Sequence, residues 1–249
     1  MTNLVCCKHC GNSALRKTGS LVYFTSLRCV YLCRFSGMEK VAEQGQELMS
    51  QVCYLSELTD KVNESRKKCG QTKIVVIDGP AGSGKTTLAN SLSGLLENCP
   101  IIHMDEIYDG WENALSPKTF SDLANWIIKP LLESKSIEFT KYDWYLEQRI
   151  EKVVINNPKV LIIEGVGSSN SEISEHACLK LWIEVDKEIG ISRVLTRDGQ
   201  QIQEQMKKWQ TRESKFFIEN NSKENSDVWI DGDPVVKIDT SSQFVRTNR

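Results

Sequence analysis

The segment Gly79–Thr87, with the sequence GPAGSGKTT, carries the most specific chemistry of the chain. Glycine adopts backbone angles closed to other residues, so Gly79, Gly82 and Gly84 allow successive N–H groups to turn inward around a polyphosphate. Lys85 supplies a mobile charge for the β- and γ-phosphates, and Thr86 is the expected magnesium ligand. We therefore predict nucleotide contacts for the whole segment, Gly79, Pro80, Ala81, Gly82, Ser83, Gly84, Lys85, Thr86 and Thr87.

The flanking sequence gives this loop the expected setting. The apolar run KIVVID, Lys73–Asp78, predicts a buried strand, and residues 85–97 predict a helix. The pattern G-x-x-x-x-G-K-[ST] thus falls on a strand-to-helix turn, where the helix N-terminus adds unpaired N–H groups and a positive dipole end. The alternative is a glycine-rich turn that only joins two elements, but such a turn does not need the adjacent Lys85 and Thr86.

An acidic cluster, HMDEIYDGW, follows the predicted strand 100–104. Asp105 is placed to accept a proton from a substrate hydroxyl or to hold a magnesium-bound water, both of which phosphoryl transfer needs. We predict that Asp105 is the catalytic base. The alternative is a helix N-cap or a loop carboxylate.

Aromatic and polar residues alternate in the segment KYDWYLEQR, residues 141–149. Tyr142 and Trp144 can stack on a ring while Asp143 and Arg149 hydrogen-bond to a sugar or base. These residues are predicted to bind the acceptor substrate. The alternative is that both aromatic side chains belong to the core.

Two further groups can act on magnesium and phosphate. Glu164 ends the predicted strand 159–163 and can orient magnesium through water, or it is an ordinary loop acid. Arg193 and Arg197 lie four residues apart on one helix face, where two guanidinium groups can clamp a transferring phosphate. Surface pairing with Glu188 or Asp198 is the competing interpretation.

The continuous apolar runs 74–77, 159–163 and 179–185 predict strands buried on both faces, which is typical of parallel sheets. A helix that Pro130 kinks is expected in the segment FSDLANWIIKPLLES, and helical material broken near Asp198 and Gly199 is expected over 187–220. We predict an α/β fold of the P-loop NTPase type. Its doubly wound, mainly parallel sheet of about five strands has helices on both faces and binds ligands at the carboxyl ends of the strands.

Composition limits the classes of partner. The 249 residues have a net charge of −2 and no Lys/Arg-rich run, so nucleic acid is not expected as a partner. No segment contains the 18 or more apolar residues of a membrane span, and we expect a soluble, cytoplasmic protein. A small-molecule acceptor and a possible homo-oligomer are the expected partners, and Cys99 and Cys178 are expected to be reduced and buried.

The sequence divides into four expected regions. Residues 1–37 are basic, contain no Asp or Glu and hold five of the nine cysteines, so they are a misassigned start or a targeting peptide. Residues 38–69 show the apolar spacing of an amphipathic helix. Residues 70–235 are expected to form the domain that holds the phosphate loop and the other motifs, and residues 236–249 a C-terminal tail.

With these residues assembled, the chain resembles the uridine/cytidine kinase and phosphoribulokinase branch of P-loop kinases over Thr72–Gly232, particularly small uridine-kinase-like proteins of actinobacterial type. The family motif D-x-F-Y is matched by Asp105–Tyr108, the Y-D-F segment by Tyr142–Trp144, the E-G pair by Glu164 and Gly165, and the lid R-x-x-x-R-D by Arg193–Asp198. The resemblance implies ATP and Mg²⁺ as cofactors and places Tyr108 in the substrate site. Where the family carries a His that helps read the base, this sequence has Glu147.

The predicted activity is transfer of the γ-phosphoryl group of ATP to a hydroxyl of a nucleoside-like or sugar-like acceptor, with Lys85, Asp105, Arg193 and Arg197 as the catalytic residues. A nucleoside monophosphate kinase is the alternative within enzymes, because its acceptor is a phosphate and needs no general base. A nucleotide-dependent switch protein is the alternative outside enzymes.

Overall fold

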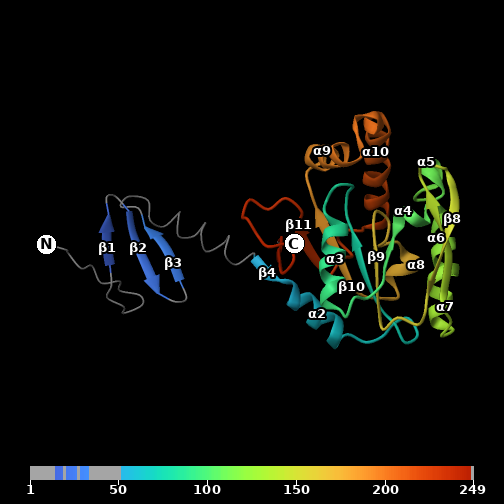
Figure 1. Ribbon diagram of the computed structural model, residues 1–249, viewed down its shortest axis with the longest axis horizontal. Coiled ribbons are helices and arrows are strands. Elements are labelled where there is room, and N and C mark those ends of the chain that lie inside the picture. The colour runs from blue at the N-terminus through green and yellow to red at the C-terminus, as the bar shows by residue number, and fades with distance from the viewer. Residues whose placement is uncertain (1–14, 19–20, 27–28, 34–51, 248–249) are drawn as a thin grey trace. The chain divides into compact units, whose positions relative to one another are not determined.

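The computed structural model describes residues 15–18, 21–26, 29–33 and 52–247 of a chain that divides into two compact units, Met1–Val52 and Cys53–Arg249 (Figure 1). In the first unit, three strands pair antiparallel in sequence order: β1 (Leu15–Thr18), β2 (Leu21–Ser26) and β3 (Cys29–Cys33). The expected roles of residues 1–37 remain predictions.

A five-stranded sheet, entirely parallel and ordered β11-β10-β5-β9-β6, forms the centre of the second unit. Its strands are β5 (Lys73–Asp78), β6 (Ile101–His103), β9 (Val160–Glu164), β10 (Ala177–Glu184) and β11 (Val228–Asp231). The central strand β5 leads into the phosphate-loop sequence. Since parallel strands end at one edge, the segments after β5, β6 and β9 lie together there. The predicted fold class is confirmed.

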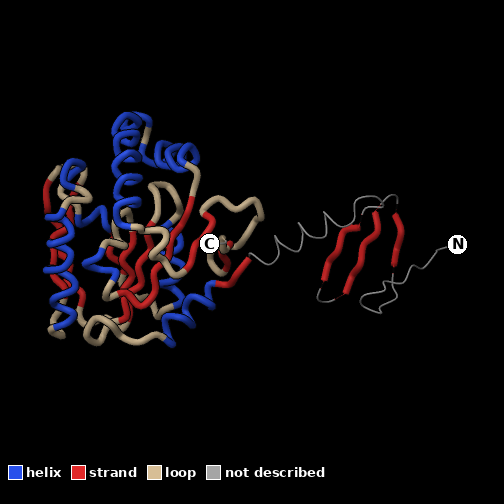
Figure 2. Tube along the Cα trace, turned by 180° about the vertical axis from the view of Figure 1, so that it is seen from behind, coloured by secondary structure: helices blue, strands red, loops and turns tan. Residues whose placement is uncertain are grey.

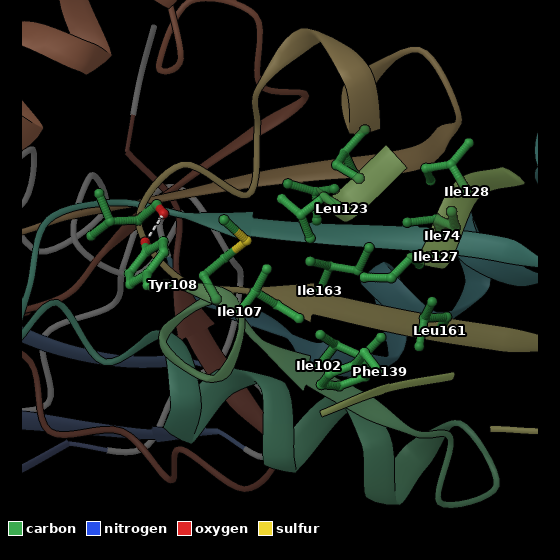
Figure 3. Close-up of a cluster of buried hydrophobic side chains, with 14 of the residues drawn as sticks. Ile74, Ile102, Ile107, Tyr108, Leu123, Ile127, Ile128, Phe139, Leu161 and Ile163 are labelled. Carbon is green, nitrogen blue, oxygen red and sulfur yellow. Dashed lines mark hydrogen bonds between the residues drawn. The ribbon is translucent and has the colours of Figure 1, made fainter. Parts of the chain in front are cut away.

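Helices flank the strands of the central sheet (Figure 2). Alternation along β5 sends its side chains into two separate cores. Val75 and Ile77 pack with α2 (Leu55–Glu64) and α3 (Lys85–Leu95) on one face. Ile74 and Val76 pack on the other face with α4 (Met104–Ile107), α6 (Pro117–Leu123) and α8 (Ser171–Ser174), as Figure 3 shows for part of this cluster. Both faces of the sheet are therefore buried, which explains why its strands are mostly apolar in sequence.

The helix expected around Pro130 is present but changes its pitch. It runs as α6, then a π-helical turn η1 (Ala124–Ile128), then α7 (Lys129–Leu132). Pro130 has no N–H to donate to the carbonyl four residues before it, so an α-helical bond is impossible there. The π-helical turn lies just before this position, so the hydrogen-bond pattern of the helix changes where the proline interrupts it.

A hairpin and two helices complete the second unit. The segment that includes Tyr142 forms β7 (Ile137–Asp143), which pairs antiparallel with β8 (Gln148–Ile155), and this hairpin was not predicted from the sequence. The predicted break in the late helical material is confirmed: α9 (Lys187–Asp198) ends at Gly199, and η2 (Gln200–Ile202) leads into α10 (Gln203–Asn220). Within the described residues, each helix is too short or too polar to cross a membrane.

The expected helix 38–69 differs from the structure in its described part. Val52–Tyr54 form a strand, β4, and the helix that follows, α2, ends at Glu64. The Ser65 hydroxyl donates to the Val62 carbonyl at 2.7 Å and ends this helix in an extended turn. The remaining expected residues, 38–51, lie outside the described residues.

The C-terminal tail expected at 236–249 is also part of the second unit. Its strand β12 (Gln243–Val245) pairs with β4, and Phe244 is only 2% exposed within the core on the α2 side of the sheet. Periodicity could not reveal either strand, because each pairs with a segment almost 200 residues away. The boundary at 235 is therefore wrong, and the folded unit extends beyond it.

We predict that Phe244→Ala lowers the free energy of unfolding by about 3–5 kcal/mol, because it leaves a cavity in a closed core. The control Val235→Ala, at a side chain that is 97% exposed, should change it by less than about 0.5 kcal/mol. Denaturant titration of both variants measures the difference. Equal stabilities would show that the tail contributes nothing to the core.

Candidate active site

The phosphate-loop sequence forms a turn between β5 and α3 in which the three expected glycines have positive φ: Gly79 at 145°, Gly82 at 77° and Gly84 at 98°. A Cβ atom on Gly82 would lie 2.2 Å from the carbonyl oxygen of Gly190 in α9. Gly82 is thus required both by its backbone angle and by this close approach.

Lys85 begins α3 and is largely buried. Its Nζ donates to the carbonyl oxygens of Gly79 and Pro80, both at 2.7 Å. Burial lowers the pKa of Lys85, and the nearby carboxylates of Glu164 and Asp78 oppose this effect. The ammonium group is therefore held inside the loop, where it can exchange these carbonyls for phosphate oxygens.

The two predicted magnesium ligands lie side by side. Thr86 Oγ1 donates to Glu164 Oε1 at 2.8 Å, and His103 Nδ1 lies 2.5 Å from the same oxygen. Burial opposes the charge of Glu164, but the bonds from His103 and Thr86 and the charge of Lys85 outweigh it, so its pKa is lowered. The bond to Glu164 in turn raises the pKa of His103 and favours the imidazolium ion. The result is a stable carboxylate beside a hydroxyl, which are hard oxygen donors that suit Mg²⁺.

Asp105 lies in α4, two residues beyond the end of β6. Its side chain reaches solvent, yet surrounding protein atoms partly desolvate it, and this effect and the charge of Glu164 raise its pKa. His103 and Arg197 oppose the rise. A carboxylate with a raised pKa accepts a proton more readily than an ordinary aspartate, as a general base must.

The two predicted phosphate-clamping arginines have different surroundings. Arg193 donates to the carbonyls of Gly82 and Gly232, at 3.3 and 2.8 Å, and pairs with Asp233 at 2.5 Å. It braces the phosphate loop against the segment after β11. Arg197 is more exposed and bonds Asp198 at 2.7 Å, the surface pairing that competed with its catalytic assignment. The carboxylates of Asp105 and Glu164 also raise its pKa, after the larger effect of Asp198.

Three residues predicted to bind the acceptor are occupied by structural contacts. The Tyr108 hydroxyl donates to the carbonyl of Val166 within the core that Figure 3 shows. Asp143 Oδ1 accepts from the N–H groups of the two residues after Trp144, at 2.8 and 2.9 Å, and so fixes the hairpin turn. Arg149 bonds the backbone carbonyls of Glu106, Thr140, Ile107 and Tyr108, three of which end α4. Sequence patterns do not distinguish such bonds from substrate contacts.

Tyr142 and Trp144 instead belong to an aromatic cluster next to the predicted base. The Trp144 indole donates to the backbone carbonyl of Asp105 at 3.0 Å, and its ring centroid lies 5.3 Å from that of Tyr142 and 5.0 Å from that of Trp111. Trp111 also contacts Trp209 of α10 at 5.7 Å. Trp111 was missed because it lies in α5 (Gly110–Asn113), a short helix without a motif of its own.

Sequence reasoning also missed two polar residues of the site, His103 and Asp78. His103 carries no predicted function, but the register of β6 and β9 sets it opposite Glu164. Asp78 was treated only as the end of β5, yet it accepts hydrogen bonds from the N–H groups of Gly79, Gly167 and Ser169. A charged residue at the end of an otherwise apolar strand was the available signal for Asp78. Glu147 lies in the hairpin turn with φ of 50° and an exposed side chain.

Comparison with known proteins agrees with this geometry. A family model described as an AAA domain matches residues 75–227. A uridine kinase of Staphylococcus epidermidis is 30% identical over 143 residues, which cover 51% of this chain and 69% of that protein. The uridine kinase of Staphylococcus aureus is 30% identical over 142 residues with the same two coverages, 51% and 69%.

Among solved structures, a possible uridine kinase from Bacillus stearothermophilus aligns with 70% of this chain and 98% of its own, at a TM-score of 0.49 and 20% identity. The family model spans more than half of the chain, and the Staphylococcus relatives are matched over 69% of their length. The chain therefore belongs to the uridine kinase-like P-loop kinases, as its motifs predicted, and is an ATP-dependent kinase of small molecules.

Proposed function

We propose that this kinase transfers the γ-phosphoryl group of ATP to a hydroxyl of a nucleoside-like or sugar-like acceptor, with uridine as the first acceptor to test. The proposal rests on one observation: the predicted magnesium ligands and the predicted catalytic base lie at the same edge of the sheet. Thr86 and Glu164 are bonded at 2.8 Å, and the charge of Glu164 acts on Asp105. The name of the Staphylococcus relatives supports the nucleoside acceptor.

On the donor side, the N–H groups of the phosphate loop and Lys85 bind the phosphates, and Thr86 and Glu164 hold Mg²⁺. The metal, when bound, neutralises charge on the transferring phosphate. Arg197 of α9 supplies a further positive charge to the phosphate. To do so, it gives up its hydrogen bond to Asp198. We assign Arg193 a bracing function, because its three bonds fix the loop and the segment after β11.

On the acceptor side, Asp105 accepts the hydroxyl proton, and Trp144 positions the backbone of this base. Tyr142, Trp144 and Trp111 offer ring faces on which a base or sugar can stack. A hydroxyl acceptor explains a carboxylate with a raised pKa at this point, since transfer to a phosphate would need no base.

An acceptor screen tests this function. The protein is incubated with ATP, Mg²⁺ and pooled nucleosides and sugars, and mass spectrometry detects the gain of one phosphoryl group. We expect a nucleoside or sugar monophosphate. Phosphorylation of nucleoside monophosphates alone would contradict the hydroxyl acceptor.

We predict that Asp105→Asn lowers kcat by about a hundredfold to ten-thousandfold, because the amide cannot accept the hydroxyl proton, while nucleotide affinity changes little. Steady-state kinetics and nucleotide titration measure the two effects. The matched control is Glu112→Gln, an exposed acid of α5, which should keep normal turnover. Normal turnover of Asp105→Asn would exclude this residue as the base.

Glu164→Gln should raise the Mg²⁺ concentration for half-maximal activity by about tenfold to hundredfold, since the amide loses the charge that attracts the metal. Magnesium titration at saturating ATP measures the shift. Glu97→Gln, at an exposed residue paired with Lys159 at 3.5 Å, serves as the control. An unchanged magnesium requirement would remove Glu164 from the metal site.

A further inference from the structure

Glu213 is a buried carboxylate to which the proposed reaction gives no function. It projects from α10, is 3% exposed, and accepts a hydrogen bond from the backbone N–H of Ala81 at 3.0 Å. Trp209, one turn earlier on α10, supplies a second hydrogen bond to this carboxylate. An acidic side chain from a distant helix thus occupies one of the N–H groups of the phosphate loop.

The charged groups that face Glu213 come from several elements. Lys85 of α3 stabilises its negative charge, whereas Asp78 of β5 destabilises it. Tyr108, after α4, also lies within electrostatic range and is neutral, because burial raises its pKa. Burial is the largest effect, and it raises the pKa of Glu213 to about 7. Both protonation states are therefore populated at neutral pH.

A nucleotide brings several negative charges to this loop. Like charges that come close in a desolvated site favour the neutral form of a carboxyl group. The protonated carboxyl group keeps an oxygen that accepts the Ala81 N–H, so neutralisation removes repulsion without releasing the loop. Lys85 cannot offset both charges equally, because the single positive charge of its ammonium group would be shared between Glu213 and the phosphates.

We propose that Glu213 is a positioning residue of the donor site, which holds the Ala81 turn of the phosphate loop from α10 and takes up a proton from solvent when a nucleotide binds. The inference rests on the proposed donor site only in that the loop binds nucleotide. The same helix contacts the aromatic cluster through Trp209 and bonds the last carbonyls of α5 through Arg212. Glu213 thereby fixes the donor loop to the helix that borders the acceptor side.

Calorimetry in two buffers of different ionisation enthalpy measures proton uptake when a non-hydrolysable ATP analogue binds with Mg²⁺. The proteins compared are the wild type, Glu213→Gln, and the control Glu219→Gln at an exposed acid on the same helix. The difference between wild type and variant cancels the protons of the nucleotide and of His103. We expect Glu213→Gln to take up about half a proton less than wild type near pH 7, and the difference to vanish near pH 5.5.

Affinity gives a second measure. If only the protonated form accepts the nucleotide, wild-type affinity falls about fivefold between pH 7 and pH 8 relative to Glu213→Gln. This loss of affinity should appear as a rise in the nucleotide Kd and KM. The kcat at saturating nucleotide should not change with it. Glu219→Gln should behave as wild type.

Equal proton uptake and equal pH dependence in wild type and Glu213→Gln would overturn the proposal. Should the variant fail to fold, infrared difference spectra of the wild type at neutral pH provide the test. Nucleotide binding should increase the C=O stretch of a protonated carboxyl group, and the absence of this gain would overturn the proposal as well. Failure of the wild type to bind nucleotide would be a distinct result, because it would refute the donor site itself.

Discussion

The buried carboxylate of Asp78 fixes the geometry on which the rest of the site depends. It has no exposed surface and lies where β5 becomes the phosphate loop. One oxygen accepts the N–H groups of Gly79 and Gly167, at 2.7 and 3.1 Å, and the other accepts the N–H and the hydroxyl of Ser169, at 3.0 and 2.5 Å. These bonds tie the first residue of the loop to the segment that follows Glu164. Burial raises the pKa of Asp78, because it disfavours the charged carboxylate, and the hydrogen bonds from these donors oppose the rise. The four bonds therefore offset the cost of burying a polar side chain here. Without them, the loop and the segment after Glu164 would lack a common anchor.

Arginine side chains perform much of the bracing around this anchor. Arg149 bonds the last carbonyls of α4, and Arg212 bonds carbonyls at the end of α5, which are groups that a short helix leaves without partners. Arg193 fixes the phosphate loop to the segment after β11. The guanidinium group suits this task, because its five donors can satisfy several carbonyls in fixed directions. Of the arginines considered for phosphate binding, Arg197 is therefore the one whose bonds, to its neighbour Asp198, can be exchanged at little cost to the fold.

The sequence predicted the features that local pattern determines. The strands β5, β9 and β10 are mostly apolar runs, and the loop after β5 has a motif whose glycines need positive φ. It could not predict β4 and β12, because their pairing joins segments almost 200 residues apart.

Some contacts of the candidate site could likewise be predicted from the sequence, and others could not. The contact between Thr86 and Glu164 follows from two strands that end at one edge, so a fold prediction implies it. The structural contacts of Tyr108, Asp143 and Arg149 depend on which backbone groups the packed hairpin and helices leave unpaired, and residue type alone does not encode this.

The two buried glutamates show how partners, more than residue type, determine chemistry. Glu164 faces an imidazole and a hydroxyl as well as Lys85, and its pKa is lowered despite burial. Burial raises the pKa of Glu213 to about 7, the charge of Asp78 adds to this rise, and the hydrogen bonds from a backbone N–H and an indole do not offset it. One acid therefore remains negative and can attract a metal, whereas the other can become neutral when phosphates approach.

A site that must bind a polyanion among several carboxylates needs both behaviours, because uniformly charged acids would repel the donor and uniformly neutral ones would not hold the metal. His103 comes to Glu164 through strand register, and Ala81 comes to Glu213 through the packing of α10 on the loop. The opposite pKa shifts of two identical side chains are thus a product of the fold.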